Sequence, residues 1–255
     1  MGEERTQEPG PTDAGAFDLV RRGPARRPLT LGALAEPVAF DLARTALVVV
    51  DMQHLFLHPD GLASVVADPV EPPRAPIGPL RALLPVLRGA DVPIVWVNWG
   101  NRADRANLTP ALRRAFARAF GGRSVGDLLP NGDPILTKGS WSAAIDAELE
   151  PAPTDIGVDK YRHSGFWDTE LDSVLRNLDV TTLLFAGVNT DQCVLHTLAD
   201  ASFLGYDCIL LEDCTATTSP RFCVDAALFN IRDAFGFTAT SGDLRAAIDR
   251  SSPRS

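Results

Sequence analysis

Short, uninterrupted apolar runs alternate with segments of helical spacing along most of this chain, and this alternation restricts the fold more than any other sequence feature. A strand is apolar at consecutive positions only when both of its faces are covered. The segments between the runs repeat apolar residues every three or four positions and can supply the covering helices. We therefore predict an α/β protein with three layers, in which a doubly wound parallel sheet carries helices on both faces. The predicted strands span 45–51, 93–99, 155–161, 181–187, 206–213 and 236–240, and the predicted helices span 77–92, 107–120, 140–149, 168–180, 193–204 and 220–235.

The 255 residues are enough for one domain with a full core. We place an N-terminal arm at residues 1–40 and predict that its polar beginning, MGEERTQEPGPTDAG, is disordered. The rest of the arm is expected to pack across the domain or a neighbouring subunit. The main domain is predicted over residues 41–245, and a C-terminal tail over 246–255.

Charge and composition argue against several kinds of partner. The net charge of −9 disfavours nucleic acid and anionic membranes. No apolar run reaches the length of a membrane span, and the N-terminus lacks the apolar core of a secretory signal, so we expect a cytoplasmic protein. The four cysteines have no metal-type spacing and are expected to be reduced thiols.

Lysine is scarce in this chain. Of 24 basic side chains, only Lys138 and Lys160 are lysine. Arginine stays charged and planar, whereas lysine offers a compact ammonium whose pKa can be tuned. We interpret Lys160 as a lysine that arginine cannot replace, and give Lys138 the same interpretation with less support. The alternative is that lysine rather than arginine stands at these two positions by chance.

Reactive side chains stand at the ends of the predicted strands. Asp51 ends the first strand and Lys160 ends the third, while Cys193 follows the fourth strand at the start of a helix. The carboxyl ends of parallel strands meet at one edge of the sheet, so we expect these three groups to lie together. The alternative is structural: Cys193 as a small buried side chain, Asp51 as a loop cap and Lys160 facing solvent.

An acid, an ammonium and a thiol in one crevice suit nucleophilic catalysis. A helix N-terminus and Lys160 would both favour the thiolate of Cys193. Asp51 would take the thiol proton and return it to a leaving amine. The turn before Cys193 is placed to hold an oxyanion with its backbone N–H groups, and it contains Val188, Asn189, Thr190 and Gln192.

Three ordered motifs resemble one known family. ALVVVDMQ with Asp51, DKYRHSGFWDTELDSVLR with Lys160 and GVNTDQCVLHTLADASFLGYDCILLEDCTA with Cys193 are similar to the isochorismatase-like cysteine hydrolases, over residues 40–245. The resemblance implies a six-stranded parallel sheet and an Asp51–Lys160–Cys193 triad. It also implies a cis peptide at Val188–Asn189 and assembly as a homodimer or homotetramer.

Branches of the family differ in their chemistry. Isochorismatases that cleave a vinyl ether can lack the nucleophilic cysteine, so its presence favours C–N hydrolysis. Nicotinamidases carry an Asp-x-His metal stretch where this chain reads VNWGNRAD, so we predict no metal site. His54 and His58 are spaced by four residues, but no third ligand is found for zinc, and we interpret both as structural.

The closest resemblance is to the ureidoacrylate amidohydrolases. The chain departs from them in reading Asn-Trp-Gly-Asn at 98–101, where they have Asn-Gly-Trp, and in placing Asn189 where they have a small residue. The resemblance and the loop positions suggest a set of substrate-binding residues: Asn98, Trp99, Asn101, Lys138, Tyr161 and Trp167.

These observations predict an amidohydrolase without a cofactor, which cleaves an amide, ureido, carbamoyl or lactam C–N bond of a small molecule through a thioester. The alternatives are a lactam hydrolase of secondary metabolism such as streptothricin hydrolase, an ether-cleaving isochorismatase, or a relative that binds a metabolite without catalysis.

Overall fold

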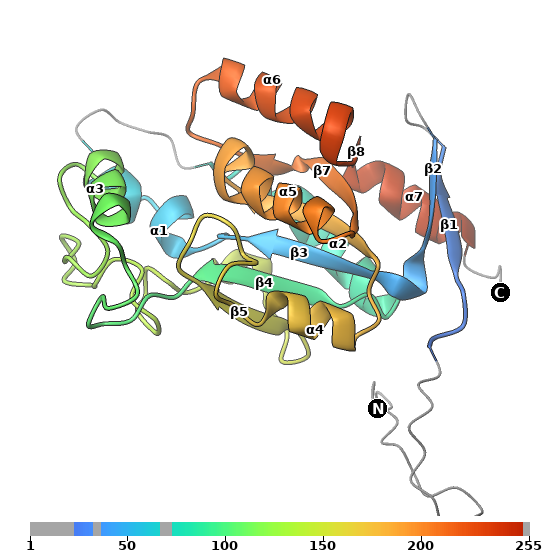
Figure 1. Ribbon diagram of the computed structural model, residues 1–255, viewed down its shortest axis with the longest axis horizontal. Helices are drawn as coiled ribbons and strands as arrows, with labels where there is room; N and C mark the ends of the chain where they lie inside the picture. Colours follow the sequence, from blue (N-terminus) through green and yellow to red (C-terminus); the bar gives the residue numbers. More distant parts are fainter. Residues whose placement is uncertain (1–22, 33–36, 67–72, 252–255) are drawn as a thin grey trace, which may run out of the picture.

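The computed structural model describes residues 23–32, 37–66 and 73–251. Its centre is a parallel sheet of six strands in the order β5-β4-β3-β6-β7-β8 (Figure 1), which confirms the predicted fold class. β3 and β6 stand in the middle and are buried along their whole length, as their unbroken apolar runs require. The strands are β3 (Thr45–Val50), β4 (Ile94–Trp99), β5 (Ile156–Lys160), β6 (Thr182–Val188), β7 (Asp207–Ala216) and β8 (Phe237–Ala239).

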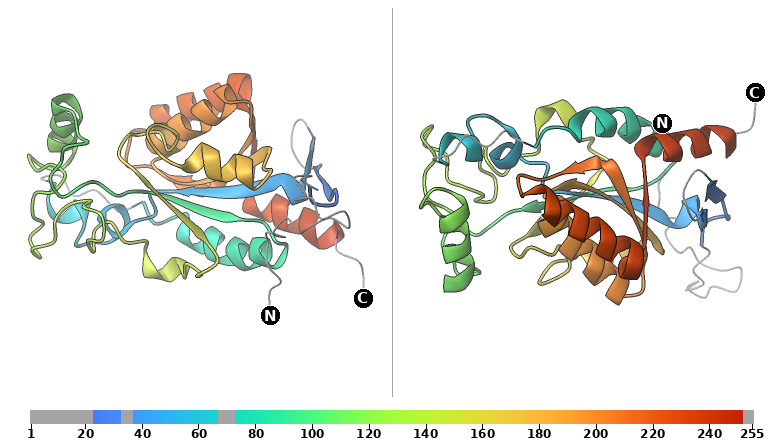
Figure 2. Two further views of the ribbon diagram at one scale, coloured as in Figure 1. Left: turned by 60° about the horizontal axis from the view of Figure 1, so that its bottom comes forward. Right: turned by 90° about the horizontal axis from the view of Figure 1, so that it is seen from above.

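Helices cover both faces of this sheet. α2 (Ile77–Gly89) and α7 (Ser241–Ser251) lie on one face, and α4 (Leu171–Asn177), α5 (Leu195–Phe203) and α6 (Arg221–Asn230) lie on the other (Figure 2). Strand alternation divides β3 between two cores: Leu47 and Val49 pack with α2 and α7, whereas Val48 and Val50 pack with α4 and α5. Single wider helical turns adjoin two of these helices, η4 (Thr190–Val194) before α5 and η5 (Ile231–Phe235) after α6.

The described part of the N-terminal arm packs on its own chain. β1 (Pro28–Leu31) and β2 (Val38–Asp41) pair antiparallel, and η1 (Leu42–Arg44) leads on to β3. Leu29 and Leu31 are buried in the core that also contains residues of α7. The stretch that we predicted to be disordered lies outside the described residues.

The predicted helix at 140–149 is wrong. The Asp133 carboxylate accepts hydrogen bonds from the backbone N–H groups of Trp141 and Ser142, at 2.9 and 2.8 Å, and holds this stretch in turns. Ile145 then bridges to Gln53, and only η3 (Ala147–Leu149) is helical. A side chain from outside the segment thus overrides its local helical spacing.

A helix crosses the boundary that we placed between the main domain and the C-terminal tail, after residue 245. α7 continues to Ser251 and buries Ala247 and Ile248 in the core. Thr240 and Asp243 begin this helix with reciprocal bonds, Asp243 N to Thr240 Oγ1 at 3.1 Å and Thr240 N to Asp243 Oδ2 at 3.2 Å. This capping arrangement is readable in the sequence TSGD, and we did not predict the helix from it.

The long connection between β4 and β5 projects beyond the carboxyl end of the sheet (Figure 1). Its one α-helix among the described residues is α3 (Pro110–Ala119). Thr109 caps the N-terminus of this helix, and its side chain accepts a hydrogen bond from Leu112 N at 3.2 Å. The same end of the molecule carries α1 (His54–Leu57) and η2 (Leu62–Ser64). None of the helices within the described ranges is long and apolar enough to cross a membrane.

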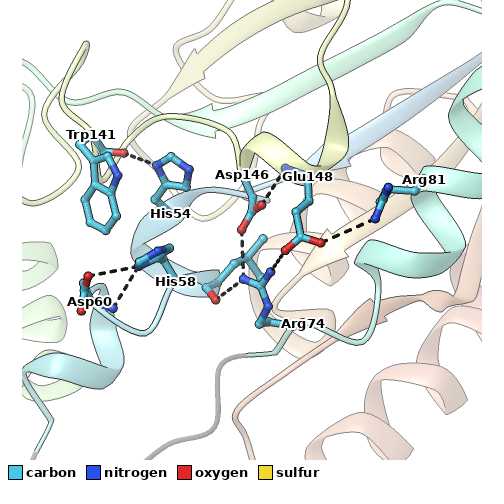
Figure 3. A network of polar contacts seen from close by, with 9 residues as sticks. His54, His58, Asp60, Arg74, Arg81, Trp141, Asp146 and Glu148 are labelled. Carbon is cyan, nitrogen blue, oxygen red and sulfur yellow. Dashed lines mark hydrogen bonds and ion pairs between the residues drawn. The ribbon is translucent and has the colours of Figure 1, made fainter.

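A polar network fastens the segment after β3 to the 141–148 stretch (Figure 3). Arg74 donates to Leu57 O at 2.7 Å, binds Asp146 at 3.1 Å and pairs with Glu148. The His54 ring stacks on Trp141 with its centroid at 4.9 Å, and His54 Nδ1 lies 3.0 Å from Trp141 O. These bonds support the segment that follows Asp51.

Candidate active site

Asp51, Lys160 and Cys193 meet at the carboxyl end of the sheet. Asp51 directly follows β3, Lys160 is the last residue of β5, and Cys193 lies in η4 after β6. Lys160 Nζ lies 2.9 Å from Asp51 Oδ2 and 3.4 Å from Cys193 Sγ. Asp51 is 1% exposed, Lys160 0% and Cys193 6%, so the carboxylate, the ammonium and the thiol are all shielded from water.

Backbone geometry between β3 and β6 brings these groups close. Asp51 adopts a left-handed conformation with φ 53°, which turns the chain sharply at the end of β3. Gly187 has φ 116°, and a Cβ there would lie 2.0 Å from Val50 O, so only glycine fits beside β3. The peptide between Val188 and Asn189 is cis, and η4 begins directly after Asn189, at Thr190, three residues beyond Gly187.

Lys160 is enclosed by four groups. Besides the carboxylate and the thiol, its ammonium donates to Arg162 O at 3.1 Å and lies 3.7 Å from the centre of the Trp99 ring. Trp99 is only 2% exposed, and its ring makes a cation–π contact with the ammonium. We had predicted it as a substrate contact. An arginine fork is too large for a space bounded so closely.

The electrostatics differ from our expectation for the thiol. The pKa of Cys193 is raised to about 12, mainly by burial and next by the nearby Asp51 carboxylate, against the opposing effect of Lys160. Burial also raises the pKa of Asp51 above its usual range, although Lys160 opposes this shift. The charges of Asp51 and Lys160 cancel each other, so ionising Cys193 would leave a net negative charge in a site that is shielded from water. The resting thiol is therefore protonated, and the prediction that its surroundings keep it ionised is wrong.

The turn before Cys193 is tied to the segment that precedes α6. Thr217 Oγ1 donates to Asp191 at 2.6 Å, and Gln192 Nε2 donates to Ser219 Oγ at 3.3 Å. The Gln192 side chain therefore points to Ser219. Val188 and Thr190 are buried, and Asn189 Oδ1 is buried without a hydrogen-bond partner.

Several residues that we predicted at the substrate lie elsewhere. Lys138 is 73% exposed in its side chain and pairs with Asp159 at 2.6 Å, so it does not reach the site. Trp167 is 63% exposed and donates to Asp200 at 2.7 Å. Neighbouring residues of a strand point to opposite faces of the sheet. The Asn98 side chain therefore points to the same face as Trp96, away from Trp99 and Lys160.

The other two predicted contacts have structural partners. Asn101 is fully buried, and its Nδ2 donates to Leu136 O at 3.0 Å, which holds the loop after β4. The Tyr161 hydroxyl donates to Asp168 O at 2.5 Å and fastens the loop after Lys160.

Three residues that we did not assign to the site shape its surroundings. Thr197 Oγ1 donates to Cys193 O at 2.6 Å and accepts from Gly165 N at 3.0 Å, which joins the turn to the loop after Lys160. The rings of Phe116 and His163 meet Trp99 edge-on, at 5.0 and 5.7 Å. Burial lowers the pKa of His163 to about 4, with smaller effects from Lys160 and His196, so this ring is neutral at pH 7. The position of Thr197, four residues after Cys193 on a helix, was the one available signal.

A thiol, a carboxylate and an ammonium at the carboxyl edge of a doubly wound sheet define a class of cysteine hydrolases. The family model for the isochorismatase domain matches residues 45–243, and the chain belongs to this family, as its motifs predicted. Family and structural neighbours are hydrolases, and the chain is an isochorismatase-family cysteine hydrolase.

Solved structures support this assignment. A cysteine hydrolase from Pseudomonas syringae pv. phaseolicola 1448A is 26% identical, with a TM-score of 0.70 over 84% of this chain and 96% of that one. An N-carbamoylsarcosine amidase from Thermoplasma acidophilum is 28% identical, with a TM-score of 0.59 over 78% of this chain and 96% of that one. An isochorismatase-like hydrolase from Alkaliphilus metalliredigens is 25% identical, with a TM-score of 0.61 over 81% and 98%.

Proposed function

We propose that this protein is an amidohydrolase that needs no cofactor and cleaves a C–N bond of a small amide, ureido, carbamoyl or lactam substrate through a thioester on Cys193. The observation that carries the proposal is the position of Lys160 Nζ, which lies within 3.4 Å of Cys193 Sγ and 2.9 Å of Asp51 Oδ2. The similarity to an N-carbamoylsarcosine amidase supports a ureido or carbamoyl substrate.

In the first half of the reaction, Cys193 Sγ attacks the substrate carbonyl carbon while its proton passes to Asp51. The raised pKa of Asp51 makes this carboxylate a stronger base than an ordinary one. It is therefore suited to take the proton of Cys193, whose own pKa is raised. The carbonyl oxygen takes the negative charge, and backbone N–H groups of the turn at 188–193 are the proposed donors to it. The C–N bond then breaks, and Asp51 returns its proton to the leaving nitrogen.

In the second half, water enters the place of the leaving amine. Asp51 takes a proton from this water as its oxygen attacks the thioester carbon. The C–S bond breaks, the acid product leaves, and the proton on Asp51 returns to Cys193 Sγ. The Lys160 ammonium stabilises whichever of its two neighbours carries the negative charge.

Asn189 is the proposed specificity residue. Its side-chain oxygen is buried and has no hydrogen-bond partner, and an unpaired buried acceptor is unfavourable. A carbamoyl or ureido N–H is a donor that could satisfy it, whereas an ether oxygen offers no donor. This contact therefore favours a substrate that carries N–H groups.

The proposal is tested by measuring hydrolysis of ureidoacrylate, N-carbamoyl acids, biuret-like amides, nicotinamide and streptothricin-type lactams, with ammonia release or mass change as the readout. Cys193→Ala is expected to abolish turnover and keep the circular dichroism spectrum of the wild type. Quenched reactions should contain protein whose mass is increased by the acyl group.

Two results would favour the alternatives. Hydrolysis of an enol ether with no acyl-protein in the mass spectrum would favour an isochorismatase-type reaction. Binding of a panel member by wild type without turnover of any of them would favour a non-catalytic relative. Full activity in Cys193→Ala would refute the thioester mechanism.

A further inference from the structure

Thr197 is a fully buried polar residue that the proposed reaction does not use. It lies on α5, one turn after Cys193. Its hydroxyl donates to Cys193 O at 2.6 Å and accepts from Gly165 N at 3.0 Å, so the same oxygen is donor and acceptor at once. A threonine in a helix often makes the first kind of bond, back to its own helix. The second bond reaches a different segment, the loop between β5 and α4, which passes beside the start of α5 (Figure 1).

The loop that contains Gly165 also holds the Lys160 ammonium. Lys160 Nζ donates to Arg162 O at 3.1 Å, and Arg162 lies three residues before Gly165. The same Nζ lies 3.4 Å from Cys193 Sγ. The thiol and the ammonium are therefore connected twice, once by their own contact and once through the loop and α5. Asp51 takes no part in the second connection.

The contact between the loop and α5 leaves no room for a side chain. A Cβ at Gly165 would lie 2.6 Å from Val97 Cγ1 and 3.3 Å from Thr197 Cγ2. The first distance is too short for two carbon atoms, so glycine is needed for the loop backbone to come close enough to bond to the hydroxyl. The bridge thus depends on two residues, a threonine on α5 and a glycine in the loop.

Removing the hydroxyl would leave a buried donor without an acceptor. Within the described ranges, Thr197 Oγ1 is the acceptor that Gly165 N has. An unpaired buried N–H is unfavourable, so the loop is expected to move until this group finds water. Arg162 O and the Lys160 ammonium would move with the loop, and a displacement of about 1 Å can lower the rate of an enzyme roughly 100-fold.

We propose that Thr197 is a positioning residue, which keeps Lys160 at its distance from Cys193 by joining the loop after β5 to the helix that follows the nucleophile. The kinetic test of this role rests on the proposed function, because it takes Cys193 as the nucleophile. A second test follows the ammonium itself and needs no substrate.

The kinetic test replaces the hydroxyl of Thr197 with a methyl group of similar size. In Thr197→Val, kcat should fall about 10- to 100-fold while KM stays within about twofold of wild type, because the reacting groups move and the substrate contacts do not. Thr197→Ser keeps the hydroxyl and should recover most of the rate. Thr169→Val is the matched control and should keep the wild-type kcat. The Thr169 hydroxyl donates to Gly165 O at 2.5 Å and accepts from Leu171 N at 3.2 Å, so it bonds to the same loop but not to α5.

The second test uses the scarcity of lysine. Protein grown on isotope-labelled lysine shows only Lys138 and Lys160 in its NMR spectrum, and the exposed Lys138 serves as an internal reference. Lys160 Nζ lies 3.7 Å from the centre of the Trp99 ring, so the ring current should shift the signals of the neighbouring methylene group upfield. Thr197→Val should reduce this shift and Thr197→Ser should restore it. Thr169→Val should leave it unchanged, and the Lys138 signals should stay constant throughout.

Gly165→Ala tests the same bridge from the loop side, and it replaces Thr197→Val if that variant does not fold. The added methyl group pushes the loop away from Val97 and α5, so kcat and the Lys160 signals should change in the same direction as in Thr197→Val.

Wild-type Lys160 signals in a folded Thr197→Val or Gly165→Ala would overturn the proposal. So would a loss of kcat in Thr169→Val equal to that in Thr197→Val, because any disturbance of the loop would then be sufficient. Failure of Thr197→Ser to recover the rate would also count against the hydroxyl. If no panel compound is hydrolysed but the lysine signals move as expected, the proposed function fails and the positioning role of Thr197 stands.

Discussion

Two lysine–aspartate pairs start from neighbouring residues of β5 and have opposite environments. Lys160 points into the protein and pairs with Asp51 at 2.9 Å, where both side chains are at most 1% exposed. Asp159 points to the other face and pairs with Lys138 at 2.6 Å, where the side chains are 39% and 73% exposed. The chemical groups are the same and the distances are similar, so the difference lies in the surroundings.

The difference shows what burial adds to an ion pair. Water screens the Lys138–Asp159 pair, and Asp159 raises the pKa of Lys138, which only keeps charged a group that is already charged at neutral pH. Around Asp51, burial raises the pKa of the carboxylate and lets it exchange protons with a thiol. The exposed pair holds a loop, whereas the buried pair can take part in chemistry.

The largest expected difference comes from removing each lysine. Lys160→Met leaves the Asp51 carboxylate buried without its partner, and we expect kcat/KM to fall at least about 1,000-fold and stability to fall by about 3–5 kcal/mol. Lys138→Met is the matched control and should keep wild-type kinetics. Steady-state assays and urea unfolding give both quantities.

A double variant separates the two effects of that change. Asp51→Asn/Lys160→Met removes both charges and should recover part of the stability without any activity. Recovery of activity in the double variant would show that the pair serves folding alone.

The next effect concerns the size of the cationic group. Lys160→Arg keeps the charge but sets a planar fork against the Trp99 ring, Arg162 O and the thiol, so we expect at least about a 100-fold loss of kcat/KM. Lys138→Arg should change neither kcat nor KM by more than about twofold. Wild-type turnover in Lys160→Arg would refute the interpretation that lysine scarcity marks a required ammonium.

A smaller effect is expected in the pH dependence. The reaction needs ionised Asp51, and because burial raises its pKa, kcat/KM should decline as the pH falls through a value above the usual carboxyl range. The decline runs in the acid direction, since protonation removes the base. Lys138→Met should leave this acid limb in place. A rate that stays constant down to the ordinary pKa of aspartate would contradict the role of burial.

The smallest effect concerns the stability of the exposed pair. Asp159→Asn should change the free energy of unfolding by less than about 1 kcal/mol, and added salt should reduce the change further. Thermal unfolding at low and high salt measures it. A larger loss would mean that the Lys138–Asp159 pair supports the loop after β4 more strongly than an exposed pair can.

Much of the fold could be predicted because the buried strands are apolar without interruption. β3, β4, β5, β6 and β7 each begin or end within a few residues of the predicted limits, and the ends of β3, β5 and β6 placed Asp51, Lys160 and Cys193 at one edge. The segment at 140–149 could not be predicted in this way, because the Asp133 side chain that holds it comes from outside the segment.

The finer errors in the site have physical causes as well. The scarcity of lysine drew attention to Lys160 and, with less support, to Lys138. Their environments differ because Lys160 belongs to β5 and points into the protein, whereas Lys138 lies outside that strand and pairs with Asp159 on its other face. The expected thiolate rested on the helix terminus and Lys160, and it left out the burial that dominates the pKa of Cys193. Desolvation is a property of the packed protein and is not visible in a motif.

The strand that carries Lys160 has only one neighbour in the sheet, because β5 is the outermost strand beside β4. Local opening of a protein begins where a short strand has a single partner, whereas β3 and β6, which position Asp51 and Cys193, are held on both sides. In rising denaturant the ammonium should therefore separate from an acid and a sulfur that are still in place. Hydrolysis would then cease at a lower urea concentration than the loss of the far-ultraviolet signal, so that inactivation reports fraying of one strand before the domain unfolds.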